Sequence, residues 1–505
     1  MQRDDFHWLI NELRSLTGDL GQLAGHDEPD LVLAIDQGGH ASRAIVFDRT
    51  GREVAEAFAP VSTYRSGNDR VEHVATEVLD SIRTALADVC QSLGTDVRRV
   101  AAAGLATQRS SIVCWDKRTR AALSPVLSWQ DRRNAAALKG WQARGADVRR
   151  ITGLPLSPHY GASKIKWCLD ELPAVRDAAA HGQLVAGPLA SWLLQQLLPG
   201  QPAVADASNA SRTLLWDLTR GDWSPELLEL AGIPATVLPQ SVPTHHAFGM
   251  LPLPGREVPL IVCTGDQSAV PFAHGRPDGH SLYLNIGTGA FLQCPVTHAP
   301  ERPTALLNSV LTWEAHGARQ SLEGTVNGAG SALSWLDDQT GLDDHRAAVS
   351  LTRDMAAALS IPVFLNGVSG IGSPYWIPHV ESRFLDEQPA DELAKVAGVV
   401  ESIAFLIAAN AAEMRAVEPD LTRIVAGGGL SRSDYLCGCI ADLTGLVVER
   451  SSLREATATG LAFLVAGMPE DWSPVAEIER FMPTHNRILA ARHDRWQQAM
   501  RELSA

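Results

Sequence analysis

The sequence predicts a mixed α/β fold made of two related halves, and two observations lead to this prediction. A short apolar run, a glycine turn and a second apolar run occur at 31–48 and again at 281–296, about 250 residues apart. Stretches with helical spacing of apolar residues lie between and after these units, so strands and helices alternate along the chain. Coincidental recurrence of a common turn is the alternative that the sequence leaves open.

Length and composition support large globular domains. The chain has 505 residues, 45% hydrophobic and 20% charged, which supplies enough apolar material for sizeable cores. At ~100–200 residues per domain, this length suggests two large α/β units or about three smaller ones. The net charge of −15 repels phosphate backbones and anionic headgroups, so nucleic acid and membrane surfaces are poor candidate partners.

Cysteine usage and the first residues predict a cytoplasmic location. The seven cysteines are scattered, which fits reduced thiols better than a disulfide framework. The opening stretch, MQRDDFHWLINELRSL, carries charges where a signal peptide needs an apolar run. No window offers the roughly 18 apolar residues that a transmembrane helix needs.

The first half begins after an N-terminal extension. Residues 1–28 combine an amphipathic helical pattern with a polar linker, GHDEPD. The runs LVLAID, RAIVFD and REVAEAFA are separated by glycine-containing turns and predict an antiparallel meander. A helix is expected over 75–94, followed by a strand over 99–106.

The second half begins near 272–280, where FAHGRPDGH is rich in glycine and polar residues. SLYLNI and AFLQCPV predict two strands around the turn GTG. Helices are expected over 327–340 and 389–416, and RIVAGGG at 423–429 predicts a buried strand followed by a helix from about Ser433. The helix that carries Trp496 is expected to cover the surface of the second domain.

For a pair of adjacent histidines and a pair of adjacent arginines, a structural role is favoured over a functional one. His245 and His246 lie in a polar, proline-containing segment, which predicts a solvated pair in a loop rather than a metal site. Arg132 and Arg133 follow WQD, and salt bridges at a helix start are favoured over binding of a phosphorylated substrate.

Three glycine turns that follow apolar runs are candidate phosphate loops, at 38–39, 287–289 and 427–429. Such turns offer backbone N–H donors to an anion. Asp36 directly precedes the first turn and could hold Mg²⁺ beside a polyphosphate. Asp266 lies at the mouth of the predicted strand PLIVCTG, where carboxylates point toward a ligand, although an acid there could instead cap a helix. No lysine follows a glycine, which excludes a Walker A loop.

Taken together, these segments resemble the FGGY carbohydrate kinases, and most closely the glycerol kinases. The similar segments, in order, are AIDQGGHASRAIVFD, GLATQRSSIVCW, LSWQDRR, GDQSAVPFA, NIGTGAF, LEGTVNGAGSALSWL, NGVSGIGSPYWIP and VAGGGLSRSDYLCGCIADLTG. The resemblance implies two actin-like (ribonuclease H-like) ATPase domains with an interdomain cleft. It also implies ATP and Mg²⁺ as cofactors and a small polyol or sugar as acceptor, and a homodimer is compatible with it. The implied domains are 29–275 for the acceptor and first phosphate loop and 276–470 for the nucleotide, followed by a helical tail at 471–505.

The resemblance also implies roles for individual residues. Asp266 would be the general base, and Asp36 and Asp266 the acids associated with Mg²⁺. The residues that would bind the acceptor are Arg109, Ser110, Trp129, His159, Gln267 and Phe291. The residues that would contact the nucleotide are Gly38, Gly39, Ser42, Arg43, Thr288, Gly289, Gly330, Gly428, Gly429 and Ser433.

Three departures from glycerol kinases qualify these roles: the first predicts slower turnover, and the other two predict a rebuilt acceptor pocket. The first phosphate loop reads DQGGHASR instead of DQGTTSSR, and each lost hydroxyl donor costs about 1 kcal/mol. Ser110 stands where those kinases have a glutamate, and His159 stands where they have a tyrosine, next to Tyr160. We therefore expect a kinase that acts on a longer polyol or sugar. The alternatives are a glycerol kinase with a substituted pocket and a non-catalytic regulator that binds nucleotide and polyol.

Overall fold

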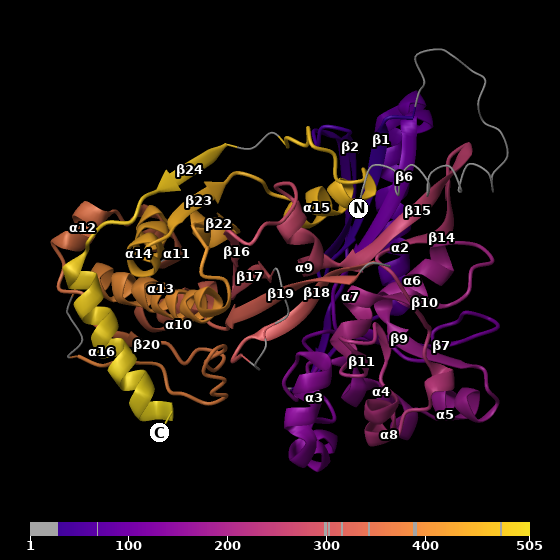
Figure 1. The fold of residues 1–505 in the computed structure, drawn as a ribbon, viewed down its shortest axis with the longest axis horizontal. Helices are drawn as coiled ribbons and strands as arrows, with labels where there is room; N and C mark the ends of the chain where they lie inside the picture. The colour runs from indigo at the N-terminus through magenta and orange to yellow at the C-terminus, as the bar shows by residue number, and fades with distance from the viewer. Residues whose placement is uncertain are drawn as a thin grey trace. The chain divides into compact units, whose positions relative to one another are not determined.

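The computed structural model describes residues 29–67, 69–296, 300, 304–314, 317–341, 344–386, 391–474 and 477–504. These residues form two compact units, labelled by element in Figure 1. The first unit consists of the described residues within Met1–Arg276, Ser309–Arg319 and Glu455–Val475, and the second of those within Pro277–Asn308, Gln320–Arg454 and Ala476–Ala505. The extension predicted at 1–28 lies outside the described residues.

The first unit is built on a six-stranded mixed sheet with the order β14-β15-β6-β1-β2-β3. Its strands are β1 (Leu31–Gln37), β2 (Ala41–Asp48), β3 (Glu53–Pro60), β6 (Val100–Thr107), β14 (His245–Leu253) and β15 (Arg256–Gly265). The first three form the predicted antiparallel meander, and β6 and β15 continue the sheet in parallel with β1. The carboxyl ends of β1, β6 and β15 therefore lie at the same edge.

Helices cover both faces of this sheet. α2 (Ala75–Leu93) buries an apolar stripe against Leu31, Leu33 and Ile35 of β1, and it ends at Gly94 with φ 57°. α15 (Ala456–Val465) packs on the opposite face against Val32 and Ala34. Successive residues of β1 thus belong to two separate cores, as the alternation of a strand requires.

The rest of the first unit carries the segments predicted to bind the acceptor. A five-stranded sheet has the order β4-β5-β8-β7-β9, with β4 (Tyr64–Ser66), β5 (Arg70–His73), β7 (Ile112–Asp116), β8 (Val126–Leu127) and β9 (Leu184–Pro188). The helices are α3 (Gly145–Thr152), α4 (Gly161–Glu171), α5 (Pro173–Ala180), α6 (Leu189–Leu197), α7 (Ala207–Ala210), α8 (Pro225–Ala231) and α9 (Asp266–Ala269). Two small pairings complete it, β10 (Val204–Asp206) with β13 (Gln240–Val242) and β11 (Trp216–Asp217) with β12 (Asp222–Trp223).

The second unit repeats the strand plan of the first. Its sheet has the order β18-β19-β17-β16-β22-β23-β24, formed by β16 (Ser281–Ile286), β17 (Ala290–Val296), β18 (Leu307–Glu314), β19 (Gly317–Val326), β22 (Arg423–Gly427), β23 (Val447–Ser451) and β24 (Ile478–Phe481). β16, β17 and β19 form an antiparallel meander, and β22 and β23 extend it in parallel. Apart from β18, which has no counterpart in the first sheet, the strands of both sheets have the same order, and the meander and its parallel extension recur, which confirms the two related halves.

The helices of the second unit are α10 (Gly330–Thr340), α11 (Asp344–Ser350), α12 (Arg353–Ala357), α13 (Glu392–Val417), α14 (Asp434–Thr444) and α16 (Arg487–Ser504), with a short pairing of β20 (Phe364–Leu365) and β21 (Arg383–Phe384). They include those predicted over 327–340, over 389–416 and from about Ser433, whereas α11 and α12 were not predicted. α13 is buried along most of its length, in one core with residues of the sheet and of α16. Trp496 of α16 is buried in that core, as expected for a helix that covers this unit.

The unit boundaries differ from the predicted ones in two segments. Residues 309–319 and 455–475 group with the first unit, so the second does not run unbroken over 276–470. α15 belongs to the first unit because it packs closely on β6. At Gly104 of β6 the approach is so close that an added Cβ would lie 2.6 Å from Cγ2 of Val465. The tail at 471–505 is also not wholly helical, because β24 pairs with β23 at the sheet edge.

The prediction of a solvated histidine loop is wrong. His245 and His246 lie on β14, and the side chain of His245 is buried. Its Nδ1 lies 2.7 Å from Oε1 of Glu314 and its Nε2 lies 3.2 Å from the carbonyl oxygen of Leu464. These partners come from segments distant in sequence, and they satisfy an imidazole that would be costly to bury alone.

The salt-bridge reading of the arginines is confirmed for Arg133. Its Nη2 lies 2.6 Å from Oδ2 of Asp131 and 2.6 Å from Oε1 of Glu72. Among the residues that the structure describes, no helix combines the length and apolarity needed to cross a membrane.

Candidate active site

The β1–β2 turn positions the first predicted phosphate loop. The N–H of Gly38 donates to the carbonyl of Ala41 at 2.9 Å, which closes the turn directly after the strand that ends with Asp36 and Gln37. A Cβ added at Gly38 would lie 3.2 Å from that carbonyl oxygen, so the turn is tight there. At Gly39 the nearest atom, Nε1 of Trp129, would be 3.9 Å away, which leaves room for a side chain.

Asp36 is a buried acid with a strongly shifted pKa. Its side chain is buried, and it faces Arg43 across the β1–β2 register. Burial raises the pKa of Asp36 to about 7; the charges of Asp266 and Glu455 add to this rise, and that of Arg43 opposes it. Arg43 is itself paired with Glu455, with Nε 3.3 Å from Oε2. The structure thus brings two predicted acids into electrostatic contact.

Asp266 is the first residue of α9, directly after the carboxyl end of β15. Its side chain is 25% exposed, its Oδ1 accepts a hydrogen bond from the N–H of Gln267 at 2.6 Å, and Nε of Arg109 lies 3.8 Å away. A Cβ at Gly265 would lie 2.4 Å from Cγ of Arg109. The glycine before Asp266 therefore allows Arg109 to lie across the end of the strand, beside the carboxylate.

Trp129 and His159 face each other on the predicted acceptor side. Their ring centroids are 5.5 Å apart in an edge-on arrangement, and His159 contacts Tyr160 in the same way at 5.4 Å. Burial lowers the pKa of His159 well below its usual value, and the nearby charges of Lys164, Arg212, Arg109 and Arg132 lower it further. His159 is therefore neutral at physiological pH.

In the second unit, the predicted loop around Thr288 and Gly289 contacts the start of α10. The N–H of Gly287 donates to the carbonyl of Gly289 at 2.8 Å, and the N–H of Gly330 donates to the carbonyl of Gly287 at 2.9 Å. The N–H of Ser331 donates to the carbonyl of Thr288 at 3.0 Å. The loop is thereby held against the N-terminus of an 11-residue helix, an end that favours anions.

Gly428 completes this group. It has φ 90°, and a Cβ there would lie 2.4 Å from Oδ1 of Asn285 and 2.5 Å from the carbonyl oxygen of Ile286, at the end of β16. The predicted nucleotide residues Thr288, Gly289, Gly330 and Gly428 therefore surround one strand end. Gly429 follows directly, at the start of a short 3₁₀ turn.

Two serines predicted to contact the nucleotide are buried, and their hydroxyls bond within the protein. Ser42 is buried, with its Oγ 2.8 Å from Oγ of Ser81, because strand alternation turns it toward α2. Ser433 is also buried: its Oγ donates to the carbonyl of Ala348 at 2.7 Å and accepts from the N–H of Leu436, which caps α14. Both hydroxyls serve the fold.

The two remaining predicted acceptor residues occupy different settings. Gln267 follows Asp266 in α9 and is partly exposed. Phe291 belongs to β17 of the second unit, where its side chain is 38% exposed.

Sequence reasoning missed three charged residues near these sites. Glu455 precedes α15 and pairs with Arg43, while Lys164 and Arg212 lie buried near His159. Lys164 in the apolar stretch ASKIKW was the one available signal, because a charged residue on the buried face of a helix requires partners. Nothing in the sequence places Glu455 next to a strand more than 400 residues earlier.

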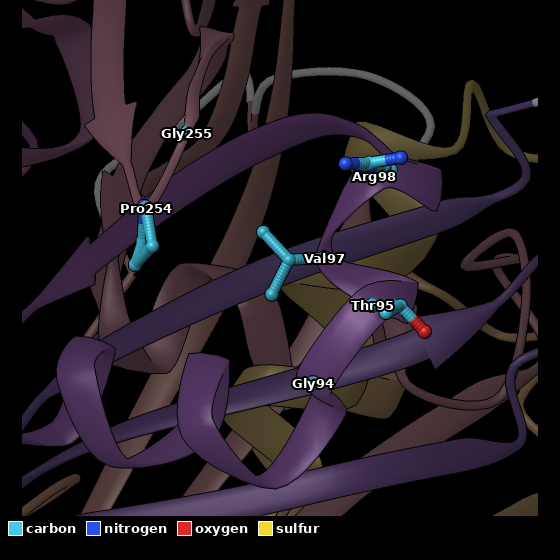
Figure 2. Close-up of a pocket in the computed structure, with 6 residues that line it drawn as sticks. All are labelled: Gly94, Thr95, Val97, Arg98, Pro254 and Gly255. Carbon is cyan, nitrogen blue, oxygen red and sulfur yellow. The ribbon is translucent and has the colours of Figure 1, made fainter.

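A separate pocket of about 260 Å³ is lined by Gly94, Thr95, Val97, Arg98, Pro254 and Gly255 (Figure 2). These residues precede the starts of β6 and β15. The pocket therefore lies at the opposite end of these strands from Asp36 and Asp266, and it contains none of the predicted site residues.

Gly428→Ala is expected to weaken nucleotide binding about tenfold or more. The new Cβ would meet a side-chain oxygen and a backbone oxygen at the loop, and the backbone there, with φ 90° and ψ 168°, is one that essentially only glycine adopts. Titration calorimetry with ATP measures the loss. Gly445→Ala is the control for an alanine at a positive φ outside the loop, because Gly445 has φ 69° but no atom within 4 Å of its Cβ position. Equal ATP affinities in the two variants would contradict the expectation.

Comparisons with known proteins agree with this arrangement. Residues 31–276 match the model of the FGGY family of carbohydrate kinases, N-terminal domain, and residues 282–468 match that of its C-terminal domain. The chain is 33% identical over 464 residues to a glycerol kinase of Trichlorobacter lovleyi, covering 89% of this chain and 92% of that protein. It is 34% identical to a glycerol kinase of Alkalilimnicola ehrlichii, covering 93% and 97%.

Solved structures share the fold. A glycerol kinase of Plasmodium falciparum with ADP superposes with a TM-score of 0.84 at 20% identity, covering 94% of this chain and 98% of that one. A xylulose kinase of Rhodospirillum rubrum gives a TM-score of 0.82 at 19% identity, covering 94% and 99%. Both family models and relatives above 30% identity span most of the chain. The chain therefore belongs to the FGGY family of carbohydrate kinases, and it is an enzyme that phosphorylates a sugar or polyol with ATP as the phosphoryl donor.

Proposed function

We propose that this kinase transfers a phosphoryl group from ATP to a hydroxyl of a four- to six-carbon polyol or ketose, with Asp266 as the general base. The observation that carries the proposal is the position of Asp266 at a strand end beside Arg109, within electrostatic reach of Asp36. Asp266 is partly exposed, so a substrate hydroxyl can approach its carboxylate. A positioned carboxylate contributes about 10²–10⁴-fold by accepting the hydroxyl proton.

Two residues of the first unit have different roles: one accepts the proton and the other orients the acceptor. Asp266 accepts the proton as the hydroxyl oxygen attacks phosphorus, and Arg109 holds the acceptor beside it by donating hydrogen bonds. Phosphoryl transfer requires alignment and neutralisation of charge more than covalent participation by the protein. The N–H groups of the glycine loops supply neutralising dipoles without any reorganisation of solvent.

Asp36 and Asp266 also fit a bound Mg²⁺. The pKa of Asp36 is raised to about 7 by burial and by the charge of Asp266, so a cation near this pair would relieve both effects. Among the described residues no three His, Cys, Asp or Glu side chains form a metal cluster. Mg²⁺ needs only one or two carboxylates when water and phosphate complete its shell. When bound, it would neutralise charge on the phosphates.

Ser110 supports an acceptor longer than glycerol. It replaces the glutamate of the glycerol kinase pattern, and it adopts a left-handed backbone with φ 63° next to Arg109. Serine is shorter than glutamate and uncharged, so the pocket gains volume and carries one carboxylate fewer beside Arg109, which still lies 3.8 Å from Asp266. Guanidinium donors can then bind a carbonyl or an additional hydroxyl of the substrate.

Ser110→Glu is expected to lower kcat/KM for the preferred acceptor and to raise it for glycerol. The added carboxylate fills the extra space and accepts hydrogen bonds from a three-carbon substrate, and specificity follows the difference in transition-state binding. Steady-state kinetics with both acceptors measure the change. Ser110→Gln is the matched control for size without charge. A wild-type enzyme that prefers glycerol to every longer acceptor would contradict the pocket argument and support a glycerol kinase with a substituted pocket.

A screen for ADP release tests the function itself. Purified protein is incubated with ATP and Mg²⁺ and with glycerol, tetritols, pentitols, hexitols and ketopentoses in turn. We expect Mg²⁺-dependent turnover with at least one acceptor of four to six carbons. Binding of ATP without turnover on any acceptor would instead support the non-catalytic regulator.

A further inference from the structure

Lys164 is a fully buried lysine in the first turns of α4, with 0% of its side chain exposed. Its Nζ donates hydrogen bonds to three backbone carbonyls: those of Ser110 at 2.9 Å, Ser128 at 2.8 Å and His159 at 2.8 Å. An ammonium group has three donors, so every N–H is used.

The three carbonyls belong to three different segments of the predicted acceptor site. Ser110 and His159 are themselves predicted to bind the acceptor, and Ser128 directly precedes Trp129. The segments lie 18 and more residues apart in sequence, and none belongs to α4. One side chain therefore ties together the three loops that carry Ser110, Trp129 and His159.

The same loops contact one another away from Lys164. The N–H of Trp129 donates to Oγ of Ser111 at 2.9 Å, and the ring of Trp129 meets that of His159 edge-on. A Cβ added at Gly161, the first residue of α4, would lie 2.8 Å from Cδ1 of Ile112. The helix, the start of β7 with the residue before it, and the aromatic pair thus form one closely packed group.

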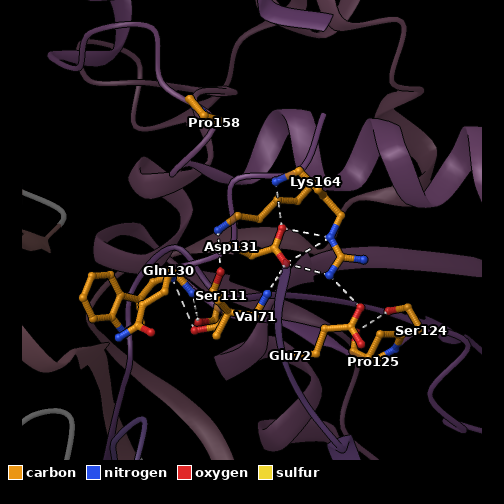
Figure 3. A network of polar contacts seen from close by, with 12 residues as sticks. Val71, Glu72, Ser111, Ser124, Pro125, Gln130, Asp131, Pro158 and Lys164 are labelled. Carbon is orange, nitrogen blue, oxygen red and sulfur yellow. Dashed lines mark hydrogen bonds and ion pairs between the residues drawn. The ribbon is translucent and has the colours of Figure 1, made fainter. Parts of the chain in front are cut away.

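The position is electrostatically unfavourable for a lysine. Burial lowers the pKa of Lys164 to about 7; Asp131 opposes this effect and Arg133 adds to it. The Asp131 carboxylate is engaged by Arg133 and by the N–H of Val71 within the polar network of Figure 3. A positive charge near a helix N-terminus also opposes the helix dipole. Apolar residues often replace buried charges without loss of stability, so stability alone gives weak grounds for a lysine here.

We infer that Lys164 is a positioning residue that fixes the spacing of the Ser110, Trp129 and His159 loops and thereby sets acceptor specificity. The specificity claim rests on the proposed function, whereas the positioning claim does not. Ser110 illustrates the need for such a support, because its left-handed backbone is uncommon for a residue other than glycine. The hydrogen bond from Lys164 to the carbonyl of Ser110 would keep this conformation in the absence of substrate.

Kinetics of Lys164→Met test the specificity claim. Methionine is unbranched and only one heavy atom shorter than lysine, but it removes all three donors, so the loops lose their common anchor. We expect KM for the preferred acceptor to rise about tenfold or more, since small displacements of a positioned group cost this much, and KM for ATP to change less than about twofold. The preference for that acceptor over glycerol should also decrease.

Lys166→Met is the matched control. Lys166 lies on the same helix, is partly exposed and pairs with Asp170, so the same chemical change there should leave both KM values unaltered. Lys164→Gln, which retains two donors, should fall between Lys164→Met and the wild type, and it serves if the methionine variant does not fold.

Fluorine NMR tests the positioning claim without any substrate. In protein labelled with 5-fluorotryptophan, the Trp129 resonance is assigned by its loss in Trp129→Phe. We expect it to shift or broaden in the Lys164 variants and to stay unchanged in Lys166→Met. An unchanged resonance with an unchanged acceptor KM would overturn the inference. Equal changes in the KM values for acceptor and ATP would also overturn it, because they would indicate a general structural role. A shifted resonance in a protein without kinase activity would refute only the proposed function.

Discussion

Asp266→Asn is expected to lower kcat by about 10²-fold or more while ATP affinity stays close to that of the wild type. Asparagine keeps the shape of the side chain and its place at the start of α9, but its amide accepts no proton. The N–H of Gln267 can still donate to the remaining oxygen. Single-turnover kinetics at saturating acceptor report the chemical step, and calorimetry with ATP reports binding.

Asp170→Asn is the control for this prediction. Asp170 is an exposed acid that pairs with Lys166 on α4 and is none of the predicted site residues, so its replacement should leave kcat unaltered. A variant of Asp266 that retains more than about a tenth of the wild-type rate would exclude a general base at this position.

Asp36→Asn is expected to stabilise the first unit against unfolding while it reduces turnover. The raised pKa of Asp36 means that the folded state holds a proton more tightly than the unfolded state does. Folding stability of the wild type therefore falls as the pH rises from about 3.8 to about 7, and the full cost of the charged form is present above pH 7. This rise in the pKa of Asp36 corresponds to a loss of folding free energy of roughly 4 kcal/mol at most.

The stabilisation should consequently depend on pH. At pH 8, without Mg²⁺ or nucleotide, the variant should unfold several degrees above the wild type, and the difference should shrink toward pH 5, where the wild-type carboxyl is protonated. Differential scanning calorimetry at both pH values measures it. Asp48→Asn, on the same sheet, should instead lower the Tm at pH 8. Burial raises the pKa of Asp48, but hydrogen bonds from Thr50 and Arg52 outweigh burial and lower it, so the charged form stabilises the fold. A lower Tm for Asp36→Asn at pH 8 would contradict the electrostatic account.

The two properties of Asp36 have one physical origin. A carboxylate that is buried near a second acid is poorly solvated and repelled by its neighbour, which destabilises the empty protein. The same surplus of negative charge suits a divalent cation. Neutralising Asp36 should therefore raise the stability of the empty protein and lower its turnover with Mg²⁺.

Local sequence signals determined much of the fold. Apolar runs of strand length separated by glycine turns predicted the meander at 31–60 and the two strands at 281–296, because each strand and turn depends on neighbouring residues. Helical periodicity located α2, α10 and α13 to within a few residues for the same reason. Apolar runs that end at an acid also located Asp36 and Asp266 at strand ends, and the order of the short motifs then led to the family.

Only the tertiary structure decided which distant residues meet. Glu455 reaches Arg43, His245 pairs with Glu314, and Lys164 binds the carbonyls of three loops, yet each pair is separated by a stretch of chain that carries no signal of the contact. The same limit explains Ser42 and Ser433, which match motif positions but point into the core. A sequence pattern records which face of its own strand or helix a residue occupies. What lies against that face is set by packing between elements, where burial makes partners obligatory and charges strong enough to shift a pKa.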